Sequence, residues 1–339
     1  MNPKDIQIQF DHRQAAHCEN GVTVNLLRFH NIQLSEAMVF GIGSGLFFAY
    51  MPFLKLNHLP VISFRPWPGM IFNRTNRRLG IRIQRCKFKD PGEAMEALDK
   101  NLEKGIPTGC LVGIYHLTYF PKAYRFHFNG HNLVVMGRQN GEYLISDPIM
   151  EGVEKLSYHD LMRVRFAKGT YPPKGRMYCI TGIPSSYDLK KAIVLGIRQT
   201  CQDMLRIPVP LFGVGGIRYL ARRMRKWPRT LGPKKACLYL GQTVRMLEEI
   251  GTGGAGFRFI YAAFLREAAK ELSQPWLNDL SKEMTEDGDR WREFAVIAGR
   301  IFKDRAGVDE SYGVAADILV DIAGREEHIF RKLSQITLD

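Results

Sequence analysis

Strand-forming patterns stop near residue 184, and this change divides the chain of 339 residues into two parts. Before it, helical patterns are followed by short runs rich in Val, Ile, Leu and Tyr, which favour strands. Helices followed by strands indicate an α+β fold rather than alternating βαβ units. We therefore predict an α+β domain over residues 1–184 and an all-helical domain over residues 185–339. Helical spacing in the second domain recurs at 189–205, 234–250, 256–272 and 312–333.

The first domain contains three predicted helices and four predicted strands. Residues 18–30 and 91–104 carry apolar side chains at helical spacing, and Ser35 is a suitable N-cap for a helix that ends near Phe40. Asn140-Gly141 is a strong hairpin signal, so the strands on either side of it are expected to pair. The predicted strands cover residues 110–115, 132–137, 142–146 and 176–182.

Three residues suited to nucleophilic catalysis lie at the ends of these elements. Cys18 begins the first helix, where the helix dipole favours a reactive thiolate. His131 lies at the start of the strand before the hairpin and Asp147 at the end of the strand after it, so strand pairing brings them together. The carboxylate can orient the imidazole, and the imidazole can act as a base toward the thiol. This is the papain arrangement; the alternative is that Cys18 is an inert core residue.

Several short motifs resemble the N-terminal domain of the butirosin-biosynthesis protein H family. A glycine cluster at residues 251–258 resembles the central motif of the helical C-terminal domain, of uncharacterised role, that this family commonly carries. The resemblance runs from about residue 12 to residue 330. The N-terminal motifs are His17-Cys18-Glu19, the turn at residues 41–45 with Phe47, Phe48 and Tyr50, Gly130-His131-Asn132 with Val134-Val135, and Ser146-Asp147-Pro148.

The resemblance implies a papain-like thiol fold used for acyl transfer. The name-giving member moves an aminoacyl group from the phosphopantetheine thioester of an acyl carrier protein to an amine on an aminoglycoside. By this likeness Cys18 is the nucleophile that forms an acyl-enzyme, His131 the general base and acid, and Asp147 the orienting carboxylate. The expected acceptor is an amine or hydroxyl, and the phosphopantetheine arrives on the partner, so no bound cofactor is expected.

Two other functions are compatible with the same residues. A cysteine peptidase or amidohydrolase would use the same triad, because its chemistry is identical up to the acyl-enzyme. A binding protein that kept the fold but lost catalysis is the second alternative. Replacement of Cys18 distinguishes the enzymes from the binding protein.

Further residues are predicted to stabilise the oxyanion. Papain-like enzymes usually place a Gln before the nucleophile for this purpose. Gln14 lies four residues before Cys18, closer than in papain itself, so His17 or the Cys18 backbone amide are alternatives.

Substrate contacts are predicted at His116 and Tyr119, which follow a predicted strand, and at Gly43 and Ser44 in the glycine-rich turn. A purely structural histidine is the alternative interpretation of His116. His127 could be mistaken for the base, but it lacks the strand and hairpin that follow His131.

The C-terminal glycines match the G-x-G-x-x-G pattern of dinucleotide loops at Gly251, Gly253 and Gly256. A dinucleotide site requires a strand before the glycines, whereas the preceding segment here is helical. A tight turn between helices is one interpretation. Another is that backbone amides at the start of the next helix bind an anion such as the pantetheine phosphate, with help from Arg258.

Charge points to an acidic partner. The chain has 48 Lys and Arg against 34 Asp and Glu, a formal net charge of +14. No acid occurs between Glu36 and Asp90 or between Asp203 and Glu248, and neither stretch carries a nucleic-acid-binding pattern. An acidic acyl carrier protein would dock by complementary charge, and a solvated basic face is the alternative. The docking candidates are Arg222, Arg223 and Arg225.

Cysteine usage and hydropathy indicate a cytoplasmic protein. The six cysteines include no C-x-x-C pair, so neither a zinc site nor a disulfide framework is predicted. The first ten residues lack the apolar core of a signal peptide. Residues 37–54 carry no charge, but their glycines and Pro52 indicate a turn rather than a membrane span. No metal, nucleic acid or integral membrane span is expected.

Overall fold

The computed structural model describes residues 5–56 and 58–338. The chain packs as two compact units, Met1–Val39 with Leu79–Tyr187 and Phe40–Arg78 with Asp188–Asp339. The long C-terminal stretch of the second unit begins at Asp188, three residues after the predicted start at 185. Residues 40–78, which were predicted to lie in the first domain, also belong to the second unit.

Aromatic packing explains why residues 40–78 belong to the C-terminal unit. The ring of Phe40 stacks on Phe257, with centroids 5.1 Å apart. Phe48 and Phe64 both contact the ring of Trp291, at centroid distances of 6.1 and 5.3 Å. These rings are almost fully buried, and burial of aromatic surface is among the largest contributions to core stability. The segment therefore supplies part of the second unit's core.

An antiparallel sheet of seven strands forms the centre of the N-terminal unit, counted over its described residues. Its first strand, β1 (Ile6–Gln7), pairs with the end of β6. The other strands follow the order β4 (Arg82–Cys86), β9 (Met177–Gly182), β5 (Thr108–Val112), β6 (His131–Gln139), β7 (Glu142–Ser146) and β8 (Glu154–Ser157).

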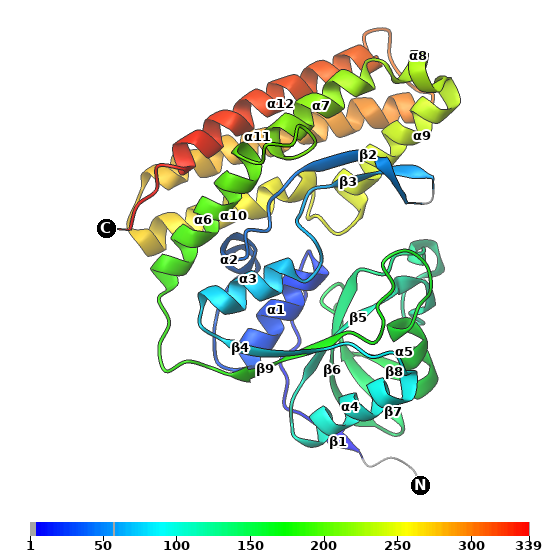
Figure 1. The fold of residues 1–339 in the computed structure, drawn as a ribbon, viewed down its shortest axis with the longest axis vertical. Coiled ribbons are helices and arrows are strands. Elements are labelled where there is room, and N and C mark those ends of the chain that lie inside the picture. The colour runs from blue at the N-terminus through cyan, green and yellow to red at the C-terminus, as the bar shows by residue number, and fades with distance from the viewer. Residues whose placement is uncertain (1–4, 57, 339) are drawn as a thin grey trace. The chain divides into compact units, whose positions relative to one another are not determined.

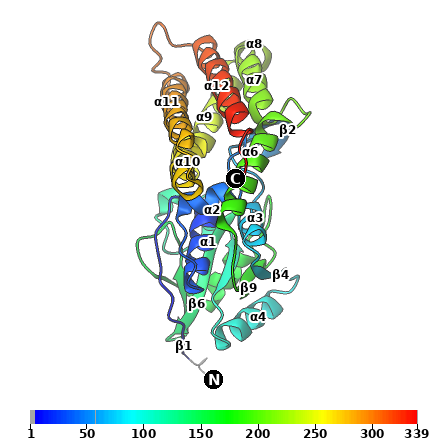
Figure 2. The ribbon, with the colours of Figure 1, turned by 90° about the vertical axis from the view of Figure 1, so that its left-hand side faces the viewer.

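Helices cover this sheet. The helix α1 (Cys18–Phe29) lies along β6, as Figure 2 shows, and its first ten residues are buried. The helices α4 (Pro91–Glu103) and α5 (Tyr158–Arg165) contribute to a core that includes Leu98, Leu133 and Leu161. Two short 3₁₀ turns, η1 (Ile114–His116) and η2 (Lys122–Tyr124), precede β6. The α+β class predicted for this domain is thereby confirmed.

The β6–β7 hairpin confirms the prediction made from Asn140-Gly141. Both residues have positive φ, 52° and 81°, as a two-residue hairpin turn of this kind requires. The strand predicted at 110–115 ends earlier, at Val112, because the chain turns at Gly113 into η1. The strands β4 and β8 and the helix α5 were not predicted.

The C-terminal unit is mainly helical (Figure 1), with α12 packed beside α7 and α11. It also contains a hairpin, β2 (Ala49–Leu56) with β3 (Leu59–Ser63), as well as α3 (Met70–Arg78) and the end of α2 (Glu36–Ile42). The elements named after Asp188 are all helical, as predicted, whereas the strands of this unit come from residues 40–78. Its helices are α6 (Leu189–Leu205), α7 (Gly213–Met224), α8 (Trp227–Leu231), α9 (Pro233–Val244), α10 (Arg258–Leu272), α11 (Trp276–Phe302) and α12 (Tyr312–Leu333), with the turns η3 (Arg245–Glu249) and η4 (Ala255–Phe257).

No helix among the described residues is both long and apolar enough to cross a membrane.

Candidate active site

The segment before Cys18 is held by a half-buried carboxylate. Glu36 accepts hydrogen bonds from the backbone N–H groups of Ala16 and His17, both at 2.9 Å. His17 is the N-cap of α1, and its Nδ1 accepts the backbone N–H of Asn20 at 3.4 Å. These contacts fix the chain on the approach to the helix and place Cys18 in the first turn, where the positive end of the helix dipole acts on its sulfur.

His131 begins the first strand of the β6–β7 hairpin and Asp147 directly follows the second strand, so the two side chains lie together. Nε2 of His131 lies 2.7 Å from Oδ2 of Asp147. The same oxygen accepts the hydroxyl of Tyr119 at 2.9 Å, and Oδ1 accepts the backbone N–H of Ile149 at 3.1 Å. The fully buried carboxylate is thus surrounded by donors, which fixes its orientation toward the imidazole.

Charge on both sides of His131 favours its protonated ring. Burial lowers the pKa of His131, but Asp147 and Cys18 each raise it by charge and by a hydrogen bond, and together they bring it to about 10. Because Nε2 faces Asp147, Nδ1 is the nitrogen available for Cys18. The interaction is reciprocal: a thiolate that favours the imidazolium is itself favoured by it.

Among the predicted substrate contacts, Tyr119 lies at this pair of residues, because its hydroxyl donates to Asp147. Burial, followed by the charge of Asp147, raises the pKa of Tyr119 well above its usual value, so its hydroxyl stays a donor. His116 instead packs edge-on against Tyr115, with ring centroids 4.8 Å apart. Burial and the nearby Arg163 lower the pKa of His116.

The two oxyanion candidates have other contacts. The amide of Gln14 is exposed and donates to the carbonyl of Ile149 at 3.4 Å, near the end of the Asp147 segment. His17 caps α1 through Nδ1, so that nitrogen faces the helix backbone. Neither observation places a side-chain donor beside the Cys18 sulfur. A role for Gln14 or His17 in oxyanion binding stays a prediction.

Gly43 and Ser44 belong to the C-terminal unit, where they serve packing. A Cβ atom on Gly43 would lie 2.6 Å from a side-chain carbon of Ile71. The buried hydroxyl of Ser44 donates to the carbonyl of Gly196 at 3.0 Å and accepts from Arg78 at 2.7 Å. The turn thus joins α3 to α6 within that unit.

Arg258 is also an internal residue of the C-terminal unit. Its guanidinium is fully buried and forms a two-pronged pair with Glu326, at 2.9 and 3.1 Å, while Nη1 donates to the carbonyl of Gly256 at 2.8 Å. The guanidinium therefore holds the glycine turn against α12. This geometry corresponds to the interhelical-turn interpretation of the glycine cluster, and it gives Arg258 a structural role.

The docking candidates differ in how available their charges are. Arg222 is exposed and lies over the ring of Tyr219, 5.9 Å from its centroid. Arg225 is exposed but forms an ion pair with Asp317, and Arg223 is half-buried. Of the three arginines, Arg222 is the one whose charge is most available to a docking protein, judged over the described part of the chain.

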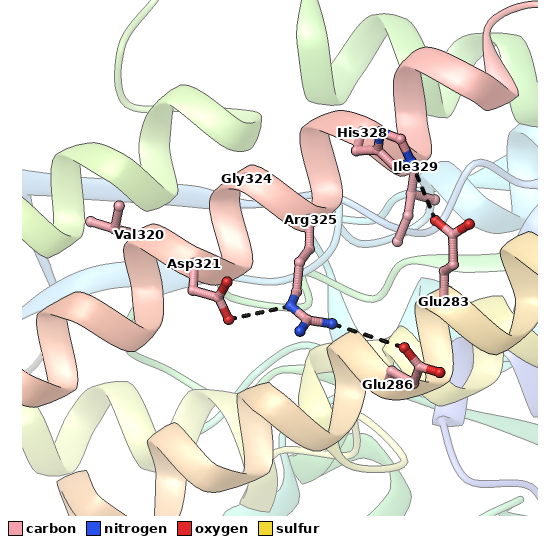
Figure 3. A pocket seen from close by; sticks show the side chains of 8 residues that line it. All are labelled: Glu283, Glu286, Val320, Asp321, Gly324, Arg325, His328 and Ile329. Atoms are coloured by element: carbon pink, nitrogen blue, oxygen red, sulfur yellow. Dashed lines mark hydrogen bonds and ion pairs between the residues drawn. The ribbon is translucent and has the colours of Figure 1, made fainter.

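A hollow between α11 and α12 (Figure 3) is lined by none of the predicted site residues. Its charged side chains pair with one another: Arg325 with Asp321 and Glu286, and His328 with Glu283. The pairs of Arg325 with Glu286 and of His328 with Glu283 join the two helices across the hollow.

A cysteine at the start of a buried helix, with a histidine at the start of one strand and an aspartate just after its antiparallel neighbour, is the arrangement found in papain-like cysteine enzymes. Residues 17–148 match the family described as butirosin biosynthesis protein H, N-terminal, which confirms the resemblance found in the motifs. Residues 159–333, just over half of the chain, match a domain of unknown function (DUF4872). The chain belongs to the family that carries this domain, with the butirosin-type domain before it.

One similar solved structure is described as a putative C39-like peptidase from Bacillus anthracis. It shares 11% sequence identity, with a TM-score of 0.38, and the match covers 53% of this chain and 98% of that one. No protein of curated function matches the sequence.

Glu36 is a site residue that the sequence analysis missed. It stands at the start of α2, where an acid is common for reasons of helix polarity alone. Only the folded chain shows that its carboxylate reaches back to the two residues before Cys18.

Proposed function

We propose that the protein is a cysteine-dependent acyltransferase, which moves an acyl or aminoacyl group from an acyl carrier protein thioester to an amine or hydroxyl. The observation that carries this proposal is His131, whose ring interacts with both Cys18 and Asp147. The match to the butirosin family supports a thioester as the donor.

The first half-reaction needs Cys18 as a thiolate and His131 as an imidazolium. The Cys18 thiolate attacks the thioester carbonyl, and the tetrahedral intermediate collapses with release of the pantetheine sulfur. The His131 imidazolium gives its proton to this leaving sulfur, so the products are acyl-Cys18, the carrier thiol and a neutral imidazole. Exchange of one thioester for another changes little in free energy, which makes the step reversible.

The second half-reaction uses the neutral imidazole. The acceptor amine or hydroxyl attacks acyl-Cys18 while His131 takes its proton, and the Cys18 thiolate leaves. This restores the starting ion pair. Asp147 stabilises the imidazolium formed at this stage and holds the ring in one orientation. A hydrolase would differ only in using water as the acceptor.

Intact mass spectrometry tests the proposal. The full chain is incubated with acyl carrier proteins loaded with different acyl groups, and its mass is compared with that of Cys18→Ala. The matched control is Cys237→Ala, which removes a half-buried cysteine of the other unit. A mass gain in the wild type and in Cys237→Ala, absent from Cys18→Ala, is the expected result.

Two other results would contradict transfer. Cleavage of peptides or simple amides without any carrier, lost in Cys18→Ala, would support the hydrolase. Absence of an acyl adduct and of hydrolysis in the wild type, with Cys18→Ala indistinguishable from it, would support a binding protein without catalysis.

A further inference from the structure

The side-chain amide of Asn132 lies beside the sulfur of Cys18. Its Nδ2 is 4.0 Å from Cys18 Sγ and 3.3 Å from the carbonyl oxygen of Gly130. Its Oδ1 accepts the hydroxyl of Tyr178 at 2.8 Å. The residue is 2% exposed, so its amide depends on protein atoms for its hydrogen bonds.

These partners fix which way the amide faces. The Gly130 carbonyl can only accept a hydrogen bond, and so can an ionised sulfur. If the amide were turned over, Oδ1 would face both of these acceptors, and the N–H groups would face a hydroxyl that can be satisfied either way. With an N–H group toward the sulfur, Oδ1 does not face another hydrogen-bond acceptor, so this is the favoured orientation of the amide.

Tyr178 reaches Asn132 because a glycine lies in its path. Tyr178 is on β9 and Asn132 on β6, with β5 between them. Gly109 of β5 is directly opposite Tyr178, and a Cβ atom there would be 2.3 Å from a carbon of the tyrosine ring. The absence of a side chain at residue 109 lets the ring cross β5 and place its hydroxyl at the amide.

The Tyr178 hydroxyl keeps its proton over the whole range in which an enzyme of this type works. Burial raises the pKa of Tyr178 well above its usual value, and the charges of Glu19 and Cys18 raise it further. The hydroxyl is consequently a stable donor to Oδ1 of Asn132.

We propose that Asn132 stabilises the Cys18 thiolate by directing an N–H group at the sulfur, and that Tyr178 is a positioning residue that holds the amide in this orientation. The inference rests on the proposed function only in taking Cys18 as the nucleophile. The charge of His131 on β6 acts on Cys18, and that of Asp147 after β7 acts on His131. The charges of Glu19 on α1, Cys110 on β5 and Arg85 on β4 act on Tyr178.

The test is the pH dependence of Cys18 alkylation by iodoacetamide in the full chain, followed at the Cys18 peptide by mass spectrometry. Tyr178→Phe removes the hydroxyl and keeps the ring, and Asn132→Leu removes the amide. Tyr143→Phe is the matched control, because Tyr143 is a buried tyrosine of the same unit whose hydroxyl donates to Asp99 at 2.8 Å.

We expect the alkylation midpoint to rise by about one pH unit in Tyr178→Phe and Asn132→Leu, so that the rate on the acid side falls about tenfold, with no change in Tyr143→Phe. Gly109→Ala, which displaces the ring, should shift the midpoint in the same direction. A purely structural role would lower thermal stability without moving the midpoint.

Folded Tyr178→Phe and Asn132→Leu variants with the wild-type midpoint would overturn the inference. A different result would contradict the proposed function. In that result, Cys18 of the wild type reacts no faster at neutral pH than the half-buried Cys237. If Asn132→Leu does not fold, Tyr178→Phe alone decides, because only a hydroxyl is removed.

Discussion

Nε2 of His131 is 2.7 Å from Oδ2 of Asp147, and this same oxygen also accepts the Tyr119 hydroxyl. The carboxylate is therefore fixed from two sides, and through it the imidazole. Because Asp147 occupies Nε2, only Nδ1 can exchange a proton with Cys18 or an acceptor. The orientation of the imidazole is thus set by contacts within the folded chain.

Asp147→Asn should nearly abolish turnover while leaving the fold intact. The amide has the shape of the carboxylate but cannot stabilise the imidazolium or fix its tautomer. We expect the rate of acyl transfer to fall by about 10²–10⁴-fold, the usual contribution of general acid–base catalysis. Single-turnover kinetics measure it, with Asp160→Asn on α5 as the control. A rate within a few fold of wild type would exclude Asp147 from the triad.

The stability that His131 contributes should decrease as the pH rises. Its folded pKa, about 10, exceeds the ordinary value of 6.5, so the folded state binds the proton more tightly than the unfolded state. The contribution is fully present below pH 6.5 and is lost as the pH rises toward 10. Thermal melts of wild type and His131→Gln across this range should converge at the alkaline end. A constant difference in melting temperature would contradict the assigned interactions.

Glu36→Ala should destabilise the approach to Cys18. It removes the acceptor of two backbone N–H groups; Ala16 is exposed, but an unsatisfied N–H group at the buried His17 costs about 1–3 kcal/mol. Urea unfolding should show a loss in that range, and Glu36→Gln a smaller one, since its amide keeps one acceptor oxygen. The exposed Glu96→Ala on α4 is the control. Equal stability of Glu36→Ala and Glu96→Ala would show that water replaces the carboxylate.

Arg258→Met should be among the most damaging substitutions in the C-terminal unit. Arg258 and Glu326 are both fully buried, and burial with the charge of Glu326 raises the pKa of the adjacent Asp287 well above its usual value. Removing only the cation leaves Glu326 uncompensated, at a cost of about 3–5 kcal/mol. The double variant Arg258→Met with Glu326→Leu should recover part of this loss in chemical denaturation. Additive losses would argue against coupling of the pair.

Carrier docking is best tested at Arg222. Reversal of Arg225 would place an acid against Asp317 and disturb the ion pair between α7 and α12, whereas Arg222 has no such acid partner among the residues that the structure describes. Arg222→Glu should weaken binding of an acidic carrier at low salt, and the difference from wild type should shrink as salt is added. Titration with fluorescently labelled carrier measures this. Unchanged affinity at low salt would indicate a solvated basic face.

The closeness of His131 to Asp147 and the helix that begins at Cys18 could be predicted because their signals are local. The Asn140-Gly141 turn determines which strand ends meet, and the helix that begins at Cys18 has a clear apolar pattern. The hairpin signal alone is enough to predict that His131 and Asp147 lie side by side, as they do. A hairpin turn and a helix start depend on neighbours in sequence, so they can be read from the sequence alone.

The parts that could not be predicted depend on contacts distant in sequence. Tyr178 reaches Asn132 only because Gly109 is opposite it in the sheet, a matter of strand register. Arg258 stands among glycines in sequence, which suggested an anion site, and its actual partner Glu326 is 68 residues away. The packing of residues 40–78 with the C-terminal helices is likewise set by aromatic contacts across the chain.

The packing of residues 40–78 with the second unit has a consequence for synthesis on the ribosome. When the chain has been made as far as Tyr187, the strands and helices of the N-terminal unit are complete, but Phe40, Phe48 and Phe64 lack the rings of the C-terminal helices that cover them in the finished fold. Their partners Phe257 and Trp291 emerge much later. During this interval the aromatic segment that connects the two stretches of the N-terminal unit lacks its own core, and such transiently uncovered apolar surface is what chaperones bind.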